Sequence, residues 1–422
     1  MSSDYSIITH PVSQLFYYVV VSTIPYYQWR HMIPGGIPVD WILTFFLLIV
    51  VAIHLITTKR IPDSLNHNLN KWFLLFFVVN IISTLFSPYQ DEAFSGIVTL
   101  VQGYIFISLS LVFITEKGFT TILPIVLCVS VGINALFSSL GYFFGIDYFN
   151  IWGGVQTYGA TIGANNMSLM CVFVIPLFVY WIFNAKSSFV FFLVLFLFVS
   201  TIGGVISTES RGGFLNLIFS LGLVAFAHRH RFRPRFFGLL ISFIGFVLIL
   251  VITAIPDSYF QRQQTLVSGE EDVSLNRRQG YIKVGLKSFN EYPLLGTGTF
   301  TFHKVWVNST ETLRFRMKER ACHNTYLEML VGTGLVGLAV FLALLLQAFF
   351  DFTRSEAFFE RIKKPEMVSA VAAYHIAFIT VLIYCLIKSL QDHKLLLLIL
   401  ALAPACLNFT EQISTNQHIN GE

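Results

Sequence analysis

One polar region of the chain contains SLNRRQGYIKVGLKSFNEYPLLGTGTF (Ser274 to Phe300) and ends at HNTYLEMLVGTGLVG (His323 to Gly337). The region begins near residue 255 and has no apolar run of the roughly 20 residues that a helix needs to span a bilayer. Almost all of the remaining chain consists of hydrophobic segments with short connections. We therefore predict one folded extramembrane loop, residues 256–324, that caps a transmembrane bundle and carries the functional residues.

The composition excludes a water-soluble protein. Of the 422 residues, 55% are hydrophobic and 12% are charged, whereas soluble domains carry about 25% charged residues. A chain with this balance and a mean hydropathy of +0.70 cannot hide its apolar surface in water, so we predict an all-α polytopic membrane protein. The 5 cysteines include no CxxC pair, which argues against a disulfide framework and a zinc site. The N-terminus lacks a charged segment before its first apolar run, so no cleavable signal peptide is expected.

Apolar runs divide the chain into about twelve predicted transmembrane helices. They cover roughly residues 12–29, 38–58, 71–88, 94–114, 120–145, 164–183, 187–206, 212–228, 236–255, 325–350, 368–388 and 394–410. The long loop falls between the ninth and tenth of these helices, in a GT-C-like arrangement. The expected parts are thus residues 1–255 with nine helices, 256–324 as the loop, and 325–422 with three helices and a cytoplasmic tail.

Lysine and arginine in the short loops set the expected orientation, because positive charges favour the cytoplasmic side. With a cytoplasmic N-terminus, the short inner loops hold 13 of these residues and the short outer loops hold 4. Long loops do not follow this rule and are left out of the count. We therefore expect a multi-pass protein of a bacterial inner membrane, with both termini in the cytoplasm and the loop in the periplasm. ATP is absent there, so an enzyme at this face needs a substrate that is already activated.

Within the loop, the stretch from Arg277 to Asn290 predicts an amphipathic helix. Its expected buried face carries Ile282, Leu286 and Phe289 with Tyr281 and Gly285 beside them, and its opposite face carries Lys283, Lys287 and Asn290. Arg278 lies four residues before Ile282, which places it near that buried face. Pro293 should end the helix, and Gly296 and Gly298 should form a tight turn.

A second basic segment, Leu313 to Arg320, alternates charged with apolar residues. Such a segment either lies on lipid headgroups or forms an ordinary solvated loop, and the sequence favours neither interpretation.

Three arginines are candidates for binding an anion. Arg211 lies in STESRGGF (Ser207 to Phe214), where small residues leave room for a ligand, although an arginine at a helix end also snorkels to the membrane surface. Arg277 and Arg278 open the loop helix, where their charge opposes the helix dipole unless an anion is bound. A diphosphate there would receive bidentate hydrogen bonds from guanidinium, whereas the simpler interpretation is a charged first turn.

His323 directly precedes the tenth predicted helix and is the candidate general base. A helix N-terminus disfavours imidazolium, so its pKa should be low and its ring neutral. Cys322 lies next to it, but adjacent side chains rarely point at one another, so a Cys-His nucleophile is not expected. No cluster of Asp and Glu near these residues predicts a metal site, and Glu209 is expected at most to pair with Arg211.

Four segments together resemble the O-antigen ligase and polymerase superfamily of bacterial surface polysaccharide assembly. They are Gly163-Ala164-Asn165-Asn166, Ser210-Arg211-Gly212, Arg278 through Pro293-Leu294-Leu295-Gly296, and His323-Asn324 followed by Gly332, Gly334 and Gly337. Each motif is weak alone, but their order and the long loop between them resemble that family over roughly residues 155–345.

The resemblance implies a metal-independent membrane glycosyltransferase that uses an undecaprenyl-diphosphate-linked glycan. The essential membrane arginine of the family corresponds to Arg211, its loop arginine to Arg278 and its loop histidine to His323. Because Arg277 and Arg278 are adjacent, either of them could match the loop arginine of the family. The spacing to the Pro293 motif favours Arg278.

The function expected from this resemblance is that of an O-antigen ligase, which moves the glycan to a sugar hydroxyl of lipid A-core with inversion at the anomeric carbon. The first alternative is an O-antigen or exopolysaccharide polymerase, whose acceptor is a second lipid-linked glycan. A ligase that glycosylates protein is less favoured because no further extramembrane domain is predicted, and a transporter of lipid-linked sugar is disfavoured by the few charges within the spans. We expect no cofactor and no nucleic-acid partner, only the donor, the acceptor and membrane lipids.

Overall fold

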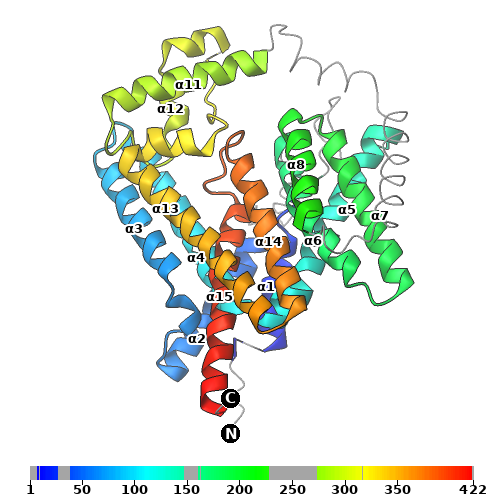
Figure 1. Cartoon of the computed structure of the whole chain (residues 1–422). Coiled ribbons are helices and arrows are strands. Elements are labelled where there is room, and N and C mark those ends of the chain that lie inside the picture. The colour runs from blue at the N-terminus through cyan, green and yellow to red at the C-terminus, as the bar shows by residue number, and fades with distance from the viewer. Residues whose placement is uncertain are drawn as a thin grey trace.

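The computed structural model describes residues 7–8, 10–26, 39–146, 160–161, 163–227, 273–315 and 317–420 (Figure 1). Regular secondary structure in these ranges is entirely helical, which confirms the predicted all-α class. The ninth predicted helix, residues 236–255, lies outside them, as does the basic connection before it. The elements are α1 (Pro11–Ser22), α2 (Val39–Thr58), η2 (Asp63–Leu65), α3 (Asn68–Leu85), α4 (Gln90–Phe113), η3 (Gly118–Ile122), α5 (Leu123–Phe144), α6 (Ala164–Phe183), α7 (Ser188–Ser207), α8 (Arg211–Ala227), α11 (Val273–Glu291), α12 (Phe302–Val307), η4 (Thr310–Phe315), α13 (Thr325–Arg361), α14 (Pro365–Tyr384) and α15 (Lys394–Asn420).

Within the described ranges, 9 helices are long and apolar enough to cross a membrane, so the protein is a polytopic membrane protein. α8, with 17 residues, is apolar but shorter than these, and α1 has 12 residues. α13 has 37 residues and runs well past the expected end at residue 350. Gly334 interrupts it, and the part after this break, residues 335–361, is about 40 Å long at 1.5 Å per residue, which exceeds the hydrocarbon thickness of a bilayer.

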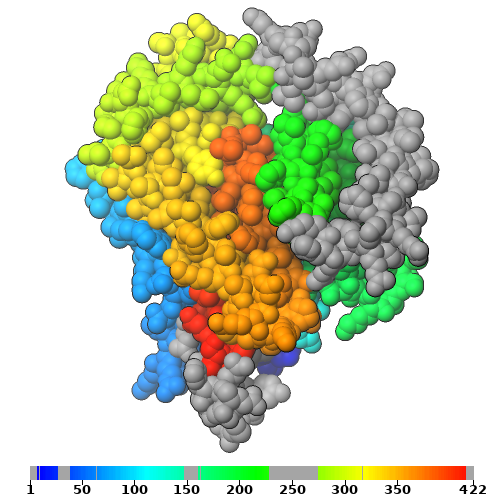
Figure 2. Space-filling model, viewed as in Figure 1, coloured from blue at the N-terminus to red at the C-terminus, as the bar shows by residue number. Residues whose placement is uncertain are grey.

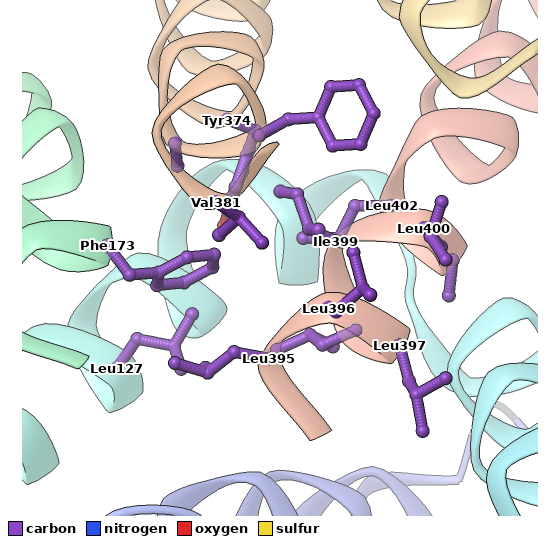
Figure 3. Close-up of a cluster of buried hydrophobic side chains, with 14 of the residues drawn as sticks. Leu127, Phe173, Tyr374, Val381, Leu395, Leu396, Leu397, Ile399, Leu400 and Leu402 are labelled. Carbon is purple, nitrogen blue, oxygen red and sulfur yellow. The ribbon is translucent and has the colours of Figure 1, made fainter. Parts of the chain in front are cut away.

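α15 occupies the centre of the bundle, where leucine side chains contact several neighbouring helices (Figure 3). Leu127 of α5, Phe173 of α6 and Tyr374 of α14 gather around its leucines. Leu395 and Leu398 are fully buried, as expected for a helix that is hydrophobic on all sides. α2 is the opposite case, because most of its long apolar side chains are exposed, as they are on a lipid-facing helix.

The described residues before α13, 273–315 and 317–324, form a cap with a small hydrophobic core that is shared with the first turns of α13. Figure 1 shows α11 lying across the end of the bundle where α8 and α13 begin, with α12 beneath it. The core of this cap consists of Tyr281, Val284, Phe302, Trp306, Cys322, Leu327 and Val331. Because Leu327 and Val331 belong to the first turns of α13, the cap packs directly on the bundle.

The predicted helix in the cap exists, and Tyr281 and Gly285, expected beside its buried face, are buried, but the predicted burial of Ile282 and Leu286 is wrong. Ile282 and Leu286 are 49% and 50% exposed, whereas Tyr281 and Val284 are buried. α11 turns this second face inward because Tyr281 packs edge-on against Trp306, with their ring centroids 4.6 Å apart. Both sets of residues recur at helical spacing, so periodicity alone does not choose between them.

Residues 293–300, which we call the glycine segment, follow α11 and form backbone hydrogen bonds with the middle of α13. The Thr297 and Gly298 amides donate to the carbonyls of Val331 and Gly332, both at 2.8 Å. These carbonyls are free because Gly334, at φ +65°, interrupts α13. Gly296 and Gly298 have φ values of +69° and +109°, which confirms the predicted turn.

The side chains of Ser83 in α3 and of Ser87, two residues after its end, hold the same segment from the other side. The Ser83 hydroxyl lies within hydrogen-bonding distance of both the Leu295 carbonyl, at 2.6 Å, and the Gly332 carbonyl, at 2.8 Å. The Ser87 hydroxyl donates to the Thr297 carbonyl at 2.5 Å. The start of α13, and with it the end of the cap, is therefore fixed relative to the bundle.

Candidate functional site

His323 lies at the junction of the cap and α13. Asn324 caps the helix, because its side-chain oxygen accepts a hydrogen bond from the Leu327 amide at 3.0 Å. His323 itself has φ +56°, a left-handed conformation that is uncommon for a residue with a side chain. Its ring centroid lies 6.2 Å from that of Tyr281, so the imidazole stands beside the aromatic core of the cap.

Burial, together with the smaller effects of the charges of Lys388, Arg278, Arg277 and Arg320, lowers the pKa of His323 to about 4. The imidazole is therefore neutral at physiological pH, as the sequence predicted. The predicted cause was the N-terminus of α13, whereas the main causes are burial and four surrounding cations.

The connection between α14 and α15, residues 385–393, is fastened to the first turn of α13. The Thr325 amide donates to the Cys385 carbonyl at 2.7 Å, and the Thr325 hydroxyl donates to the Lys388 carbonyl at 2.7 Å. The Ser389 hydroxyl donates to the Glu328 carboxylate at 2.6 Å. These bonds hold Lys388 next to His323, and Figure 2 shows this connection reaching the surface between α11 and α8.

Lys388 was not predicted as a site residue, because the sequence places it 65 residues after His323 in a short loop. Burial lowers the pKa of Lys388 to about 8, while the nearby Asp392 carboxylate acts in the opposite direction. Of the four cations, Lys388 has the largest influence on His323. Only the packing of the α14–α15 connection on α13 reveals this neighbour.

Arg277 and Arg278 have different surroundings. Arg278 is half-buried and its charge acts on both His323 and the hydroxyl of Tyr384 in α14, so it faces the bundle. The guanidinium carbon of Arg277 lies 5.9 Å from the ring centroid of Phe315, within the cap. Arg278 was expected near the buried face because it lies four residues before Ile282. Ile282 is exposed, so this reason is wrong, although Arg278 is itself half-buried.

Arg320 is a second residue whose position the sequence did not reveal. It is the last residue of the basic segment Leu313 to Arg320, which the sequence allowed either to lie on lipid headgroups or to form a solvated loop. The beginning of that segment is exposed, with the Arg314 side chain at 72%, whereas Arg320 is half-buried. The charge of Arg320 acts on Tyr281 and His323, so this residue turns towards the site.

Arg211 is the first residue of α8 and is half-buried. Ser210 before it donates to the Asn165 side chain at 2.8 Å and accepts from the Gly213 amide at 3.1 Å. The Tyr384 hydroxyl donates to the Asn165 carbonyl at 3.0 Å. The structure thus brings together the 163–166 and 210–212 segments, and Tyr384 links them electrostatically to Arg278.

Two further contacts involve the neighbours of Arg211 in the sequence. A Cβ added to Gly212 would overlap the side chain of Ile387, so the start of α8 touches the connection that carries Lys388. The buried Glu209 carboxylate accepts a hydrogen bond from the Tyr142 hydroxyl at 3.1 Å. Arg211, Arg278 and Lys388 therefore belong to elements that meet at one end of the bundle.

Among the residues that the structure describes, no group of three or more His, Cys, Asp and Glu side chains is arranged to hold a metal ion. The chemistry available is that of several cations around one neutral imidazole. Such a site can bind a polyanion through guanidinium forks and can accept a proton from a hydroxyl.

Comparison with known protein families matches residues 194–342 to the family described as O-Antigen ligase. This range contains Arg211, Arg277, Arg278, Arg320 and His323, and it ends within α13. No curated protein matches the chain.

Proposed function

We propose that this chain, a membrane protein of the O-antigen ligase family through its residues 194–342, is itself an O-antigen ligase. Proteins of this family transfer lipid-linked glycans in the membrane. The proposed reaction moves a glycan from undecaprenyl diphosphate to a sugar hydroxyl of lipid A-core. The observation that carries the proposal is a neutral His323 beside four cations at the start of α13.

Arg211 and Arg278 are proposed to bind the diphosphate of the donor. Diphosphate is a good leaving group, so the reaction needs stabilisation of the negative charge that develops on it more than it needs an acid. The half-buried position of both arginines and the link from Arg278 to Tyr384 support this role. Arg277 was the alternative to Arg278, which the spacing to the Pro293 motif already favoured, and the contact of Arg277 with Phe315 supports the same choice.

His323 is proposed to take the proton from the acceptor hydroxyl. The hydroxyl oxygen attacks the anomeric carbon from the side opposite the diphosphate, and the bond from that carbon to the diphosphate oxygen breaks. The leaving oxygen keeps the electron pair, so the anomeric configuration inverts. A neutral ring is required for this step, and the burial of His323 supports it.

The site end of the bundle is proposed to face the periplasm, with both termini in the cytoplasm. The asymmetry of 13 against 4 positive residues in the short loops supports this orientation. A cysteine introduced at Asn308, which is exposed in the cap, should react with a membrane-impermeant reagent in intact spheroplasts. A cysteine at Glu360, at the other end of α13, should react only after permeabilisation, and the reverse result would invert the orientation.

Deletion of the gene separates the ligase from the related polymerase. Loss of a ligase leaves lipid A-core without polymer and accumulates lipid-linked polymer, whereas loss of a polymerase leaves core with a single repeat unit. Gel analysis of surface polysaccharide distinguishes the two patterns. An unchanged pattern in the deletion strain would contradict both functions.

A further inference from the structure

We propose that Arg277 and Arg320 form a second anion subsite, on the cap side of His323, which binds an acidic group of the acceptor glycan. The group would be a phosphate or a carboxylate near the reacting hydroxyl. This inference rests on the proposed glycan transfer and names the class of acceptor for it.

Arg277 lies at the far end of a chain of aromatic contacts that leads to His323, and Arg320 is placed near the same rings by its charge, which acts on Tyr281. Arg277 lies 5.9 Å from the centroid of Phe315, whose ring is 5.9 Å from that of Trp306. The Trp306 and Tyr281 centroids are 4.6 Å apart, and Tyr281 lies 6.2 Å from His323. The packed rings therefore hold Arg277 at a fixed place in the cap, close enough for its charge to reach His323.

Both guanidinium groups have a buried Nε donor that finds no acceptor among the residues that the structure describes. The Nε atoms of Arg277 and Arg320 are buried and have no hydrogen-bond partner in the structure. A buried N–H without a partner is unfavourable, and it is more so on a charged group. A phosphate or carboxylate matches the planar fork of a guanidinium group and would satisfy these donors.

The carboxylates nearest in sequence to Arg320 are engaged with other residues. Glu319 pairs with Lys304 at 2.8 Å, and Glu311 pairs with Arg314 at 3.7 Å. Lys304 also binds Glu92 in α4 at 3.0 Å, which turns Glu319 away from the site. Within the described part of the chain, these two carboxylates therefore pair with other cations and not with Arg277 or Arg320.

The subsite is separate from the proposed donor site. Arg278 acts on Tyr384 in the bundle, whereas Arg277 and Arg320 both act on Tyr281 in the cap. His323 lies within reach of all three charges. A donor diphosphate on the bundle side leaves the cap side for the acceptor, and an acidic acceptor would place its hydroxyl beside the imidazole.

The test compares three forms of one lipid-anchored core oligosaccharide: intact, dephosphorylated and carboxyl-reduced. Equilibrium binding and the transfer rate are both measured with the purified protein in detergent. Wild-type protein should bind the intact form about 10-fold more tightly than the form that lacks the recognised acid, as expected for a charged hydrogen-bonded pair. The dephosphorylated and carboxyl-reduced forms identify which acid is recognised.

The variants Arg320→Gln and Arg277→Gln should each lower the ratio of the two affinities towards one. Arg314→Gln, which changes an exposed arginine of the basic segment that contains Arg320, should leave this ratio unchanged. If a Gln variant does not fold, Arg→Lys variants and the wild-type comparison still decide the question. Equal binding of all three forms by the wild type would overturn the subsite and leave the transfer activity standing. A rise in donor KM with an unchanged acceptor preference in Arg320→Gln would also overturn it. A preference in binding without any transfer would support the subsite and contradict the proposed function.

Discussion

Arg277 and Arg278 are neighbours in the sequence, but successive helical residues point about 100° apart, and here they reach different partners. Arg277 packs on Phe315 in the cap, while Arg278 reaches Tyr384 in the bundle. The assignment of the donor diphosphate to Arg278 depends on this division. Lysine keeps the charge at either position but lacks the bidentate fork, so a conservative change separates the two roles.

We expect Arg278→Lys to lower kcat by about 10²- to 10³-fold, which is typical for loss of one preorganised electrostatic contact. Arg277→Lys should reduce the rate only mildly. Both variants are compared with wild type in a transfer assay at equal expression. The opposite ranking would shift the donor site by one residue along α11.

His323→Ala should lower turnover by about 10²- to 10⁴-fold, the usual contribution of a general base. Donor binding should largely survive, because the arginines hold the diphosphate, and His323→Gln should not restore the rate. Donor affinity and single-turnover rate are measured separately. If donor binding is lost while bound donor turns over normally, His323 is a binding residue and not the base.

The acid limb of the pH–rate profile should lie near pH 4, because the His323 ring becomes protonated and inactive below its lowered pKa. The cations Lys388, Arg278, Arg277 and Arg320 all disfavour the imidazolium. Lys388→Met removes the strongest of them, so the pKa of His323 should rise and the limb should move to higher pH. A profile of kcat/KM for both proteins measures this shift. An unmoved limb would show that His323 does not titrate in the rate-limiting step.

At the scale of the elements, the glycine segment and the break in α13 fit one another backbone to backbone. A Cβ at Gly296 would lie 2.5 Å from the Gly332 carbonyl carbon, and one at Gly334 would overlap the backbone of Leu294. The close approach of the two backbones therefore explains why glycine occupies these positions of the motif. These glycines allow the chain after α11 to enter the bundle and fix the residues that precede α13.

Gly334→Ala should destabilise the protein by about 1–3 kcal/mol or more, because it adds a side chain at φ +65° as well as a clash. Gly222→Ala is the matched control, since a Cβ there meets nothing within 4 Å. Alanine in that helix should leave stability unchanged or raise it slightly. Thermal unfolding in detergent compares the two variants, and equal Tm values would refute the backbone packing.

The sequence predicted the helix in the cap and placed Tyr281 beside its buried face, but it also predicted the burial of Ile282 and Leu286, which are exposed. Tyr281 and Ile282 are both apolar and both continue at helical spacing, so either stripe satisfies the periodicity. Tyr281 is buried because Trp306, which lies 25 residues later, offers it a partner. Such a contact between distant residues has no trace in the local pattern.

At the scale of the whole molecule, hydrophobic runs predicted the 9 membrane-length helices of the described residues, since each membrane helix needs its own apolar segment. The count of twelve stays a prediction, because α1 and α8 are shorter and residues 236–255 lie outside the described ranges. The end of α13 was misjudged because the helix continues beyond the apolar run, to Arg361. The site was predicted in part, as Arg211, Arg278 and His323 occur in short motifs. Lys388 and Arg320 have no such motif and join the site only through packing of the α14–α15 connection and of the cap on α13.

The central claim is that this site transfers a glycan from a lipid diphosphate. A transfer assay with purified protein in liposomes, supplied with undecaprenyl-diphosphate-linked glycan and lipid A-core, measures this transfer directly. The account predicts equal amounts of released undecaprenyl diphosphate and glycosylated lipid A-core, in the presence of a chelator as well, and almost none with His323→Ala. Extension of a second lipid-linked glycan with no product on lipid A-core, or full activity of His323→Ala, would contradict it.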